Sequence, residues 1–246
     1  MKLAVAQIKL TGRLDENRKK ILSYIEKACS EGIEVVAFPE TALTGYIYED
    51  FLKVDYKEVE VALREIQEIV DRCDVCAIIG TPLKEGDILY NSVVVLTPRG
   101  EKCTYHKQML TTYEHDYFRA GSEETVFSYK GCDIGVIICR DQNNPHITER
   151  LKQRGVKAVY ICSAHYYGLV ESKMKREKNI ALPIARAYEN NVYVLKVNAV
   201  GTLMKKISFG NSMIVHPNGI VVHRGSEHDE ELLSCEVTLD KENEQW

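Results

Sequence analysis

The first 80 residues alternate between short apolar runs and longer segments in which apolar residues recur every three to four positions. The short runs predict buried strands over residues 2–8, 33–38 and 75–80. The longer segments predict two amphipathic helices, whose apolar faces are Ile21, Leu22, Ile25 and Ala28 in the first and Val59, Leu63, Ile66 and Val70 in the second. The resulting β-α-β-α-β order is typical of an α/β protein.

Beyond residue 80 the chain continues with further strands and two helical segments. Strands are predicted at residues 91–96, 101–106, 131–138, 156–162, 192–197, 213–216 and 232–237. Asp15 is expected to cap the first helix, Pro145 to begin a later one, and Pro183 to interrupt the helical segment that follows Glu171. No repeat or linker divides the chain, which predicts one domain over residues 1–246.

Cys139 ends the apolar run 131–138 and shortly precedes Pro145, so it is predicted to lie at a strand-to-helix turn. Such a turn lifts the side chain out of the sheet and directs the following backbone N–H groups toward an oxyanion formed beside it. A buried structural cysteine is the alternative, because free cysteine is among the most buried residue types. A nucleophilic cysteine also requires partners elsewhere in the chain.

Two charged residues directly follow predicted strands and are candidates for those partners. Glu40 is placed to act as a general base, and the ammonium of Lys107 can stabilise an oxyanion or lower the pKa of a thiol. The ordinary alternatives are an exposed loop acid or helix cap and a solvated lysine. After Lys107 comes a polar, aromatic segment, 108–121, of a length that is usually functional. His106 and His115 have no matching acid at helical or hairpin spacing and stay unassigned.

Composition narrows the class of protein. A net charge of -4 and a pI near 6.0 offer no basic surface for nucleic acid, and no apolar run is long enough for a membrane span. The N-terminal apolar run is too short for a signal peptide, so we expect a cytoplasmic protein whose eight cysteines stay reduced. Cys73 and Cys76 lack a second pair at metal-site spacing, and we interpret them as structural.

Three segments resemble, in order and spacing, the signatures of the nitrilase, or carbon-nitrogen hydrolase, superfamily. They are Phe-Pro-Glu at 38–40, Tyr-His-Lys at 105–107 followed by Glu114 and Gly121, and Gly-Val-Ile-Ile-Cys-Arg-Asp at 135–141. Residues 185–194 and 210–219 are similar to later segments of the same family, so the resemblance runs almost end to end. It implies a four-layer α-β-β-α sandwich of the α/β (α+β) class and a homodimer or higher homo-oligomer, with no metal or organic cofactor.

The resemblance also implies catalytic roles. Glu40, Lys107 and Cys139 match a Glu-Lys-Cys triad, and Glu114 matches a second glutamate that holds the lysine and the substrate. The cysteine attacks a carbon-nitrogen bond, the lysine and the backbone N–H of Arg140 stabilise the oxyanion, and a thioester is hydrolysed by water activated by the glutamate.

Substrate-binding residues follow from a closer local resemblance of residues 41–52 to the glutaminase domain of glutamine-dependent NAD synthetases. There, tyrosines matching Tyr46 and Tyr113 and a serine matching Ser163 line the glutamine pocket. Gln142 replaces a more aromatic residue and suits a polar substrate or caps the next helix, and His165 either lines a pocket or is packed in the core.

We therefore expect a stand-alone amidase acting on a small polar carboxamide or an N-carbamoyl compound. A glutaminase subunit that supplies ammonia to a separate synthetase and a non-catalytic nitrilase-like interaction protein are the alternatives.

Overall fold

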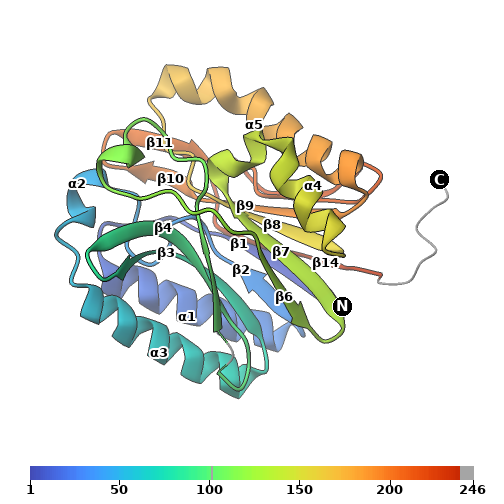
Figure 1. Cartoon of the computed structure of the whole chain (residues 1–246), viewed down its shortest axis with the longest axis horizontal. Coiled ribbons are helices and arrows are strands. Elements are labelled where there is room, and N and C mark those ends of the chain that lie inside the picture. Colours follow the sequence, from blue (N-terminus) through green and yellow to red (C-terminus); the bar gives the residue numbers. More distant parts are fainter. Residues whose placement is uncertain (101, 239–246) are drawn as a thin grey trace.

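The computed structural model describes residues 1–100 and 102–238, and it consists of two six-stranded β-sheets packed face to face between layers of helices. Helices α1 (Leu14–Ser30) and α3 (Tyr56–Cys73) cover one outer face, and α4 (Pro145–Gln153) and α5 (Leu169–Asn190) cover the other (Figure 1). The predicted four-layer α-β-β-α sandwich is confirmed.

The first sheet has the strand order β14-β1-β2-β3-β4-β5. Its members are β1 (Lys2–Gln7), β2 (Val35–Ala37), β3 (Cys76–Glu85), β4 (Ile88–Leu96), β5 (Lys102–His106) and β14 (Glu231–Glu236). Strands β1, β2 and β3 are parallel, as the helical crossovers α1 and α3 require, whereas β4, β5 and β14 pair antiparallel with their neighbours.

The second sheet has the order β13-β12-β9-β8-β7-β6, with β7, β8 and β9 parallel. Its members are β6 (Thr125–Tyr129), β7 (Cys132–Ile138), β8 (Ala158–Ser163), β9 (Tyr193–Asn198), β12 (Met213–Val215) and β13 (Val221–Arg224). A hairpin of β10 (Val200–Leu203) and β11 (Lys206–Phe209), the short helix α2 (Tyr48–Phe51) and the 3-10 turns η1 (Glu114–Asp116) and η2 (Cys139–Asn143) complete the elements.

The continuous apolar runs of the sequence are explained by strands that are buried on both faces. In β1, Leu3 and Val5 belong to the core between the two sheets, and Ala4 and Ala6 belong to the core under α1 and α3. A strand in a sheet covered on both faces has no solvent side, so apolar residues fill successive positions rather than alternate ones. The predicted apolar face of α3 is likewise buried in the second of these cores.

Two predictions about helices are wrong. Asp15 does not cap α1, because the helix begins at Leu14 and Asp15 lies in the first turn, where it pairs with Lys19 at 2.8 Å. Pro183 does not interrupt α5, which runs unbroken through it. The carbonyl of Asn179, which loses its helical partner because proline has no N–H, accepts a hydrogen bond from the Lys196 ammonium at 2.9 Å instead. Pro145 begins α4 as predicted, after the capping side chain of Asn144.

Several strands were missed or predicted too short. The sequence reading omitted β6 and the β10–β11 hairpin, and β3 and β4 extend to Glu85 and begin at Ile88, well beyond the predicted ends. The extension of β3 ends in the exposed residues Lys84 and Glu85, which interrupt the apolar pattern, whereas the extension of β4 is the short segment Ile-Leu-Tyr at 88–90. Residue 101, predicted to begin a strand, and residues 239–246 lie outside the described part of the chain.

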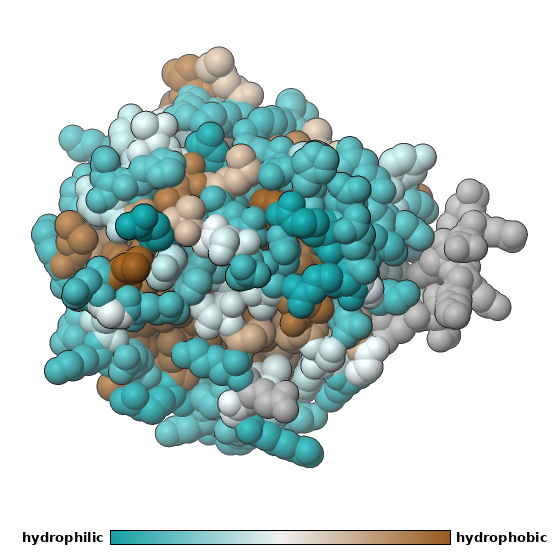
Figure 2. Space-filling model, in the orientation of Figure 1, coloured by the Kyte–Doolittle hydropathy of each residue, from teal (hydrophilic) through white to brown (hydrophobic). Residues whose placement is uncertain are grey.

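The face of the molecule in Figure 2 is predominantly hydrophilic, with apolar side chains scattered among polar ones. Among the helices of residues 1–100 and 102–238, none combines the length and apolar character needed to cross a membrane.

Candidate active site

Strand ends from both sheets meet at one place in the fold. Glu40 follows β2 and Lys107 follows β5, which runs in the same direction as β2 because two antiparallel steps separate β5 from β3. In the second sheet, Cys139 follows β7 and Ala164 follows β8. Reacting groups of open α/β sheets gather at such carboxyl ends, and here two packed sheets contribute to the same site.

A buried ion cluster forms the base of this site. The Lys107 ammonium lies 2.6 Å from Oε1 of Glu40 and 2.7 Å from Oε1 of Glu114, and all three side chains are fully buried. Oε2 of Glu40 accepts the backbone N–H of Ala164 at 3.1 Å, and Oε2 of Glu114 accepts that of Thr111 at 2.7 Å. Each carboxylate is therefore held by both an ammonium and a backbone donor, which fixes its position.

Asn91, in β4, links the two carboxylates. Its Nδ2 donates to Oε1 of Glu40 at 2.8 Å and to Oε1 of Glu114 at 2.9 Å, and its own backbone carbonyl accepts the N–H of Lys107 at 2.9 Å. The sequence interpretation missed this residue. The sequence does place this amide at the start of an otherwise apolar predicted strand. A polar side chain buried there needs hydrogen-bond partners, because an unpaired buried polar group is costly.

Gly80 in β3 makes room for the glutamate. A Cβ at this position would lie 2.0 Å from the carbonyl oxygen of Pro39 and 2.8 Å from Cα of Glu40. Any side chain at residue 80 would collide with backbone atoms of the loop after β2 and displace Glu40 from Lys107.

The pKa values of the two carboxyl groups are shifted in opposite directions. Burial raises the pKa of Glu40, and the negative charge of Glu114 raises it further against the opposing effect of Lys107. For Glu114, burial also raises the pKa, but Lys107 together with hydrogen bonds to Thr111 and Asn91 lowers it below its ordinary value. Burial disfavours the charged form of Lys107, yet the charges of both glutamates raise its pKa well above its ordinary value. Glu114 is thus the ionised partner of a charged lysine, and Glu40 is the carboxyl suited to proton exchange.

Cys139 lies where β7 passes into the turn η2, with a backbone φ of +47°. This left-handed conformation is uncommon for a residue other than glycine, and strained backbone of this kind is often found at functional sites. Burial raises the pKa of the Cys139 thiol, and its interaction with the nearby Glu40 carboxylate raises it further. The resting cysteine is therefore a protonated thiol in contact with a candidate base.

Asp141 anchors the cysteine turn. Its Oδ2 accepts the backbone N–H of Ile138 at 3.0 Å and the hydroxyl of Tyr105 at 2.8 Å, and its Oδ1 accepts the N–H of Met109 at 2.7 Å. Burial raises the pKa of Asp141 to about 6. This one carboxylate ties the turn at residue 139 to the segment that follows Lys107.

A cavity of about 250 Å³ opens beside Cys139. Four of the six residues predicted to bind substrate line it: Tyr46, Tyr113, Arg140 and His165. The other two, Gln142 and Ser163, are buried and are not among its lining side chains. Lining residues that the sequence interpretation did not name include Tyr48, Tyr167, Lys175 and Lys206, which come from segments that fold together only in three dimensions.

Two of the lining residues have further contacts that matter for the site. The Tyr46 hydroxyl lies 3.1 Å from Oε1 of Glu114, which connects the cavity wall to the ion cluster. The backbone N–H of His165 donates to Oδ1 of Asn198 at 3.0 Å, and burial together with the nearby Lys196 lowers the pKa of its ring well below the ordinary value. His165 is therefore a neutral wall residue at neutral pH.

No group of three or more His, Cys, Asp or Glu residues in the described part of the chain is arranged to hold a metal ion. The histidines that the sequence interpretation left unassigned lie away from the cavity: His106 bonds Ser92 at 2.8 Å and Glu85 at 3.1 Å, in a partly exposed position.

The family model described as carbon-nitrogen hydrolase matches residues 2–244. The chain is 32% identical to a glutamine-dependent NAD(+) synthetase of Aquifex aeolicus over 98% of its own length, but it spans only 42% of that protein. It is also 32% identical to a nitrilase of Pyrococcus abyssi, over 92% of this chain and 84% of the nitrilase.

Among solved structures, an amidase from Nesterenkonia sp. superposes with a TM-score of 0.86 at 22% identity, covering 95% of this chain and 89% of the amidase. This likeness supports the fold. The family match over almost the whole chain and the kinship with a nitrilase over most of its length support the class of reaction. The chain belongs to the carbon-nitrogen hydrolase family of the nitrilase superfamily and is an enzyme acting on carbon-nitrogen bonds other than peptide bonds.

Proposed function

We propose that the protein hydrolyses the carbon-nitrogen bond of a small polar carboxamide or N-carbamoyl compound and releases ammonia through a thioester on Cys139. The observation that carries this proposal is the contact between the Cys139 thiol and Glu40, whose carboxylate also lies 2.6 Å from the Lys107 ammonium, at the wall of a cavity. A nucleophile, a base and a fixed positive charge are the groups that acyl transfer requires.

In the first stage, Glu40 takes the proton of the Cys139 thiol as the sulfur attacks the carbonyl carbon of the amide. The carbonyl oxygen becomes an oxyanion, which the Lys107 ammonium and the backbone N–H of Arg140 stabilise. The carbon-nitrogen bond then breaks, and the nitrogen leaves as ammonia with the proton that Glu40 had taken. A thioester on Cys139 and an ionised Glu40 remain.

In the second stage, water replaces the ammonia. Glu40 takes one proton of the water as its oxygen attacks the thioester carbon, and the same oxyanion site stabilises the second tetrahedral intermediate. The carbon-sulfur bond breaks, the acid product forms, and the proton returns from Glu40 to the sulfur. Because Glu40 accepts and donates a proton in each stage, its raised pKa suits the role, whereas the lowered pKa of Glu114 suits a residue that keeps Lys107 charged and in place.

A glutaminase that supplies ammonia to a separate synthetase is the second candidate. It is favoured by the kinship with the NAD(+) synthetase of Aquifex aeolicus, of which this chain spans 42%. The positions of Tyr46 and Tyr113 on the cavity wall are compatible with it. This candidate predicts that glutamine is the preferred substrate and that ammonia release accelerates when a synthetase is added.

Two further expectations belong to the proposal. A homodimer or higher homo-oligomer is supported by large apolar side chains left exposed on α5, among them Leu169, Val170 and Met174; apolar side chains are visible at the outer edge of α5 in Figure 2. Exposed apolar patches of this kind often mark protein interfaces. A cytoplasmic location is supported by eight cysteines that are all free thiols.

The test is ammonia release from a panel of ω-amides including glutamine, simple aliphatic amides, N-carbamoyl amino acids and nitriles. We expect one of the first three classes to be turned over and Cys139→Ala to abolish that turnover. Cys29→Ala, which removes an exposed thiol far from the site, is the matched control and should leave turnover unchanged. Undiminished ammonia release by a folded Cys139→Ala variant would overturn the proposal.

A further inference from the structure

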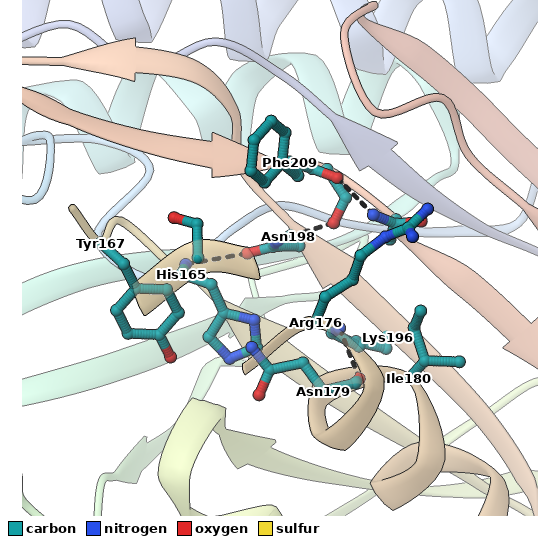
Figure 3. Close-up of a pocket in the computed structure, with 11 residues that line it drawn as sticks. His165, Tyr167, Arg176, Asn179, Ile180, Lys196, Asn198 and Phe209 are labelled. Atoms are coloured by element: carbon teal, nitrogen blue, oxygen red, sulfur yellow. Dashed lines mark hydrogen bonds between the residues drawn. The ribbon is translucent and has the colours of Figure 1, made fainter. Parts of the chain in front are cut away.

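A second, smaller cavity of about 30 Å³ adjoins the first, between β9 and the N-terminal half of α5 (Figure 3). His165 and Tyr167 line both cavities, and their rings stack with centroids 5.8 Å apart. The remaining walls include Asn179 and Asn198. Since a single water needs roughly 10–15 Å³ of such space, there is room for about two water-sized atoms, which matches the two oxygens of a carboxylate.

Lys196 supplies the charge in this second cavity. Its side chain is 1% exposed, and its one hydrogen bond within the described residues is to the carbonyl oxygen of Asn179 at 2.9 Å (Figure 3). That carbonyl is free because Pro183 cannot donate to it. An ammonium has three N–H donors, so two remain for a ligand.

Among the described residues, no carboxylate lines the cavity around Lys196. Arg176 adds a second cation to the lining, and Glu227, outside the lining, interacts with Arg176 and Asn211. Arg224 hydrogen-bonds Oδ1 of Asn211 at 2.7 Å on the far side. Burial lowers the pKa of Lys196 to about 7, with the Cys139 thiol opposing that effect and Arg224 adding to it. Buried cations are normally paired, so without an acid in the lining Lys196 holds its proton weakly, and a bound anion would stabilise its charged form.

We propose that this cavity receives a carboxylate of the substrate and that Lys196 determines specificity for it. This inference rests on the proposed amide hydrolysis at Cys139. The wall shared through His165 and Tyr167 places the two cavities within reach of one extended molecule. The substrate class is then a short acid with an amide or carbamoyl group at one end and a carboxylate at the other.

A purely structural role is the competing explanation, in which Lys196 only satisfies the carbonyl released by Pro183. The two explanations differ in which substrates respond. Loss of a structural contact lowers activity toward all amides together, whereas loss of a carboxylate partner affects only amides that carry a carboxylate.

The experiment compares kcat/KM for succinamate and glutaramate with that for butyramide and valeramide, which have the same chain lengths without the charge. Wild-type enzyme is expected to prefer a carboxylated amide at least tenfold, since a hydrogen bond to a charged group has that effect on binding. Lys196→Met should abolish the preference, because the KM for the carboxylated amides should rise at least tenfold more than the KM for the neutral amides. Lys173→Met removes an exposed charge from α5, the helix that borders the cavity, and should change neither class.

Binding is measured separately, by calorimetric titration of glutarate into Cys139→Ala and Cys139→Ala/Lys196→Met. Binding by the first variant and at least tenfold weaker binding by the second support the inference even if no amide is turned over, a result that would count against the proposed function alone. Equal use of both amide classes by wild-type enzyme, an equal loss of both in Lys196→Met, or glutarate binding that is the same in both titrated variants would overturn it.

Discussion

Replacing Glu114 by glutamine tests whether the two buried carboxylates have different roles, with Glu40 exchanging protons and Glu114 holding Lys107 in place. The substitution keeps the shape of the side chain and removes its negative charge. Lys107 then has Glu40 as its one charged partner within the cluster. Since the charge of Glu114 raises the pKa of Glu40, its removal should lower that pKa.

The size of the effect can be bounded from the geometry. Oε1 of Glu40 and Oε1 of Glu114 bond the same Lys107 nitrogen at 2.6 and 2.7 Å, so the two oxygens lie no more than 5.3 Å apart. At an effective dielectric constant of about 20, two unit charges at that distance repel by about 3 kcal/mol. One pH unit corresponds to about 1.4 kcal/mol, so a change of this order is readily resolved in a pH profile.

The assay is kcat/KM for the preferred amide as a function of pH, which reports the ionisation of the free enzyme. We expect the acid limb of the Glu114→Gln profile to move to lower pH. The plateau should fall roughly 100-fold, because Lys107 is no longer held on both sides. Glu123→Gln, at an exposed position in the same segment, is the control and should reproduce the wild-type profile.

An acid limb that stays in place or moves to higher pH in Glu114→Gln would refute the reasoning, because it would mean that the charge of Glu114 does not act on the proposed base, Glu40. A plateau equal to that of wild type would show that Glu114 does not position Lys107.

Three further predictions follow from buried polar contacts. Asn91→Leu should lower kcat by 10- to 100-fold with little change in KM, since both carboxylates lose a donor; an unchanged kcat would contradict the bridging role. Asp141→Asn should lower the free energy of unfolding, measured by urea denaturation, by about 1–3 kcal/mol, because an amide cannot accept from both Ile138 and Met109 and still bond the tyrosine; a stability equal to wild type would count against this. Lys196 has a pKa of about 7 in the folded protein and near 10.5 in the unfolded chain, so the unfolded chain binds its proton more tightly. The free energy of unfolding of wild type, relative to that of Lys196→Met, should therefore rise between pH 7 and 10. A difference that does not change with pH would show that the lysine is not buried as described.

The layers of the fold could be predicted because they depend on local patterns. The apolar runs of β1 and β2 and the helical spacing of α3 are set by burial against neighbouring layers, and each leaves a periodic trace in the sequence. Strand β6 left no such trace, since only Phe127 among its five residues is fully buried. Where α5 runs through Pro183, the Asn179 carbonyl is bonded by Lys196, a contact between distant segments that no local rule contains.

The residues of the candidate site fall into the same two groups, those that local sequence patterns indicate and those that depend on contacts between distant segments. Cys139, Glu40 and Lys107 were found because each stands at the end of a strand, a position readable from the sequence, and family motifs then linked them. Asn91 was missed because its role depends on the register of β4 against β5, which brings its carbonyl to the N–H of Lys107. Gln142 and Ser163 were expected on the substrate wall from the comparison with the family pattern, but both are buried and neither lines the cavity beside Cys139.

The central claim is that Cys139 carries the acyl group of the substrate. The most direct measurement is intact-protein mass spectrometry of samples quenched during turnover of the preferred amide, with digestion to locate any adduct. We expect a mass increase equal to the acyl group on the peptide that contains Cys139. This increase should disappear when the substrate is exhausted and be absent in Cys139→Ala. Continued turnover with no adduct at any time, or an adduct on another residue that persists in Cys139→Ala, would contradict it.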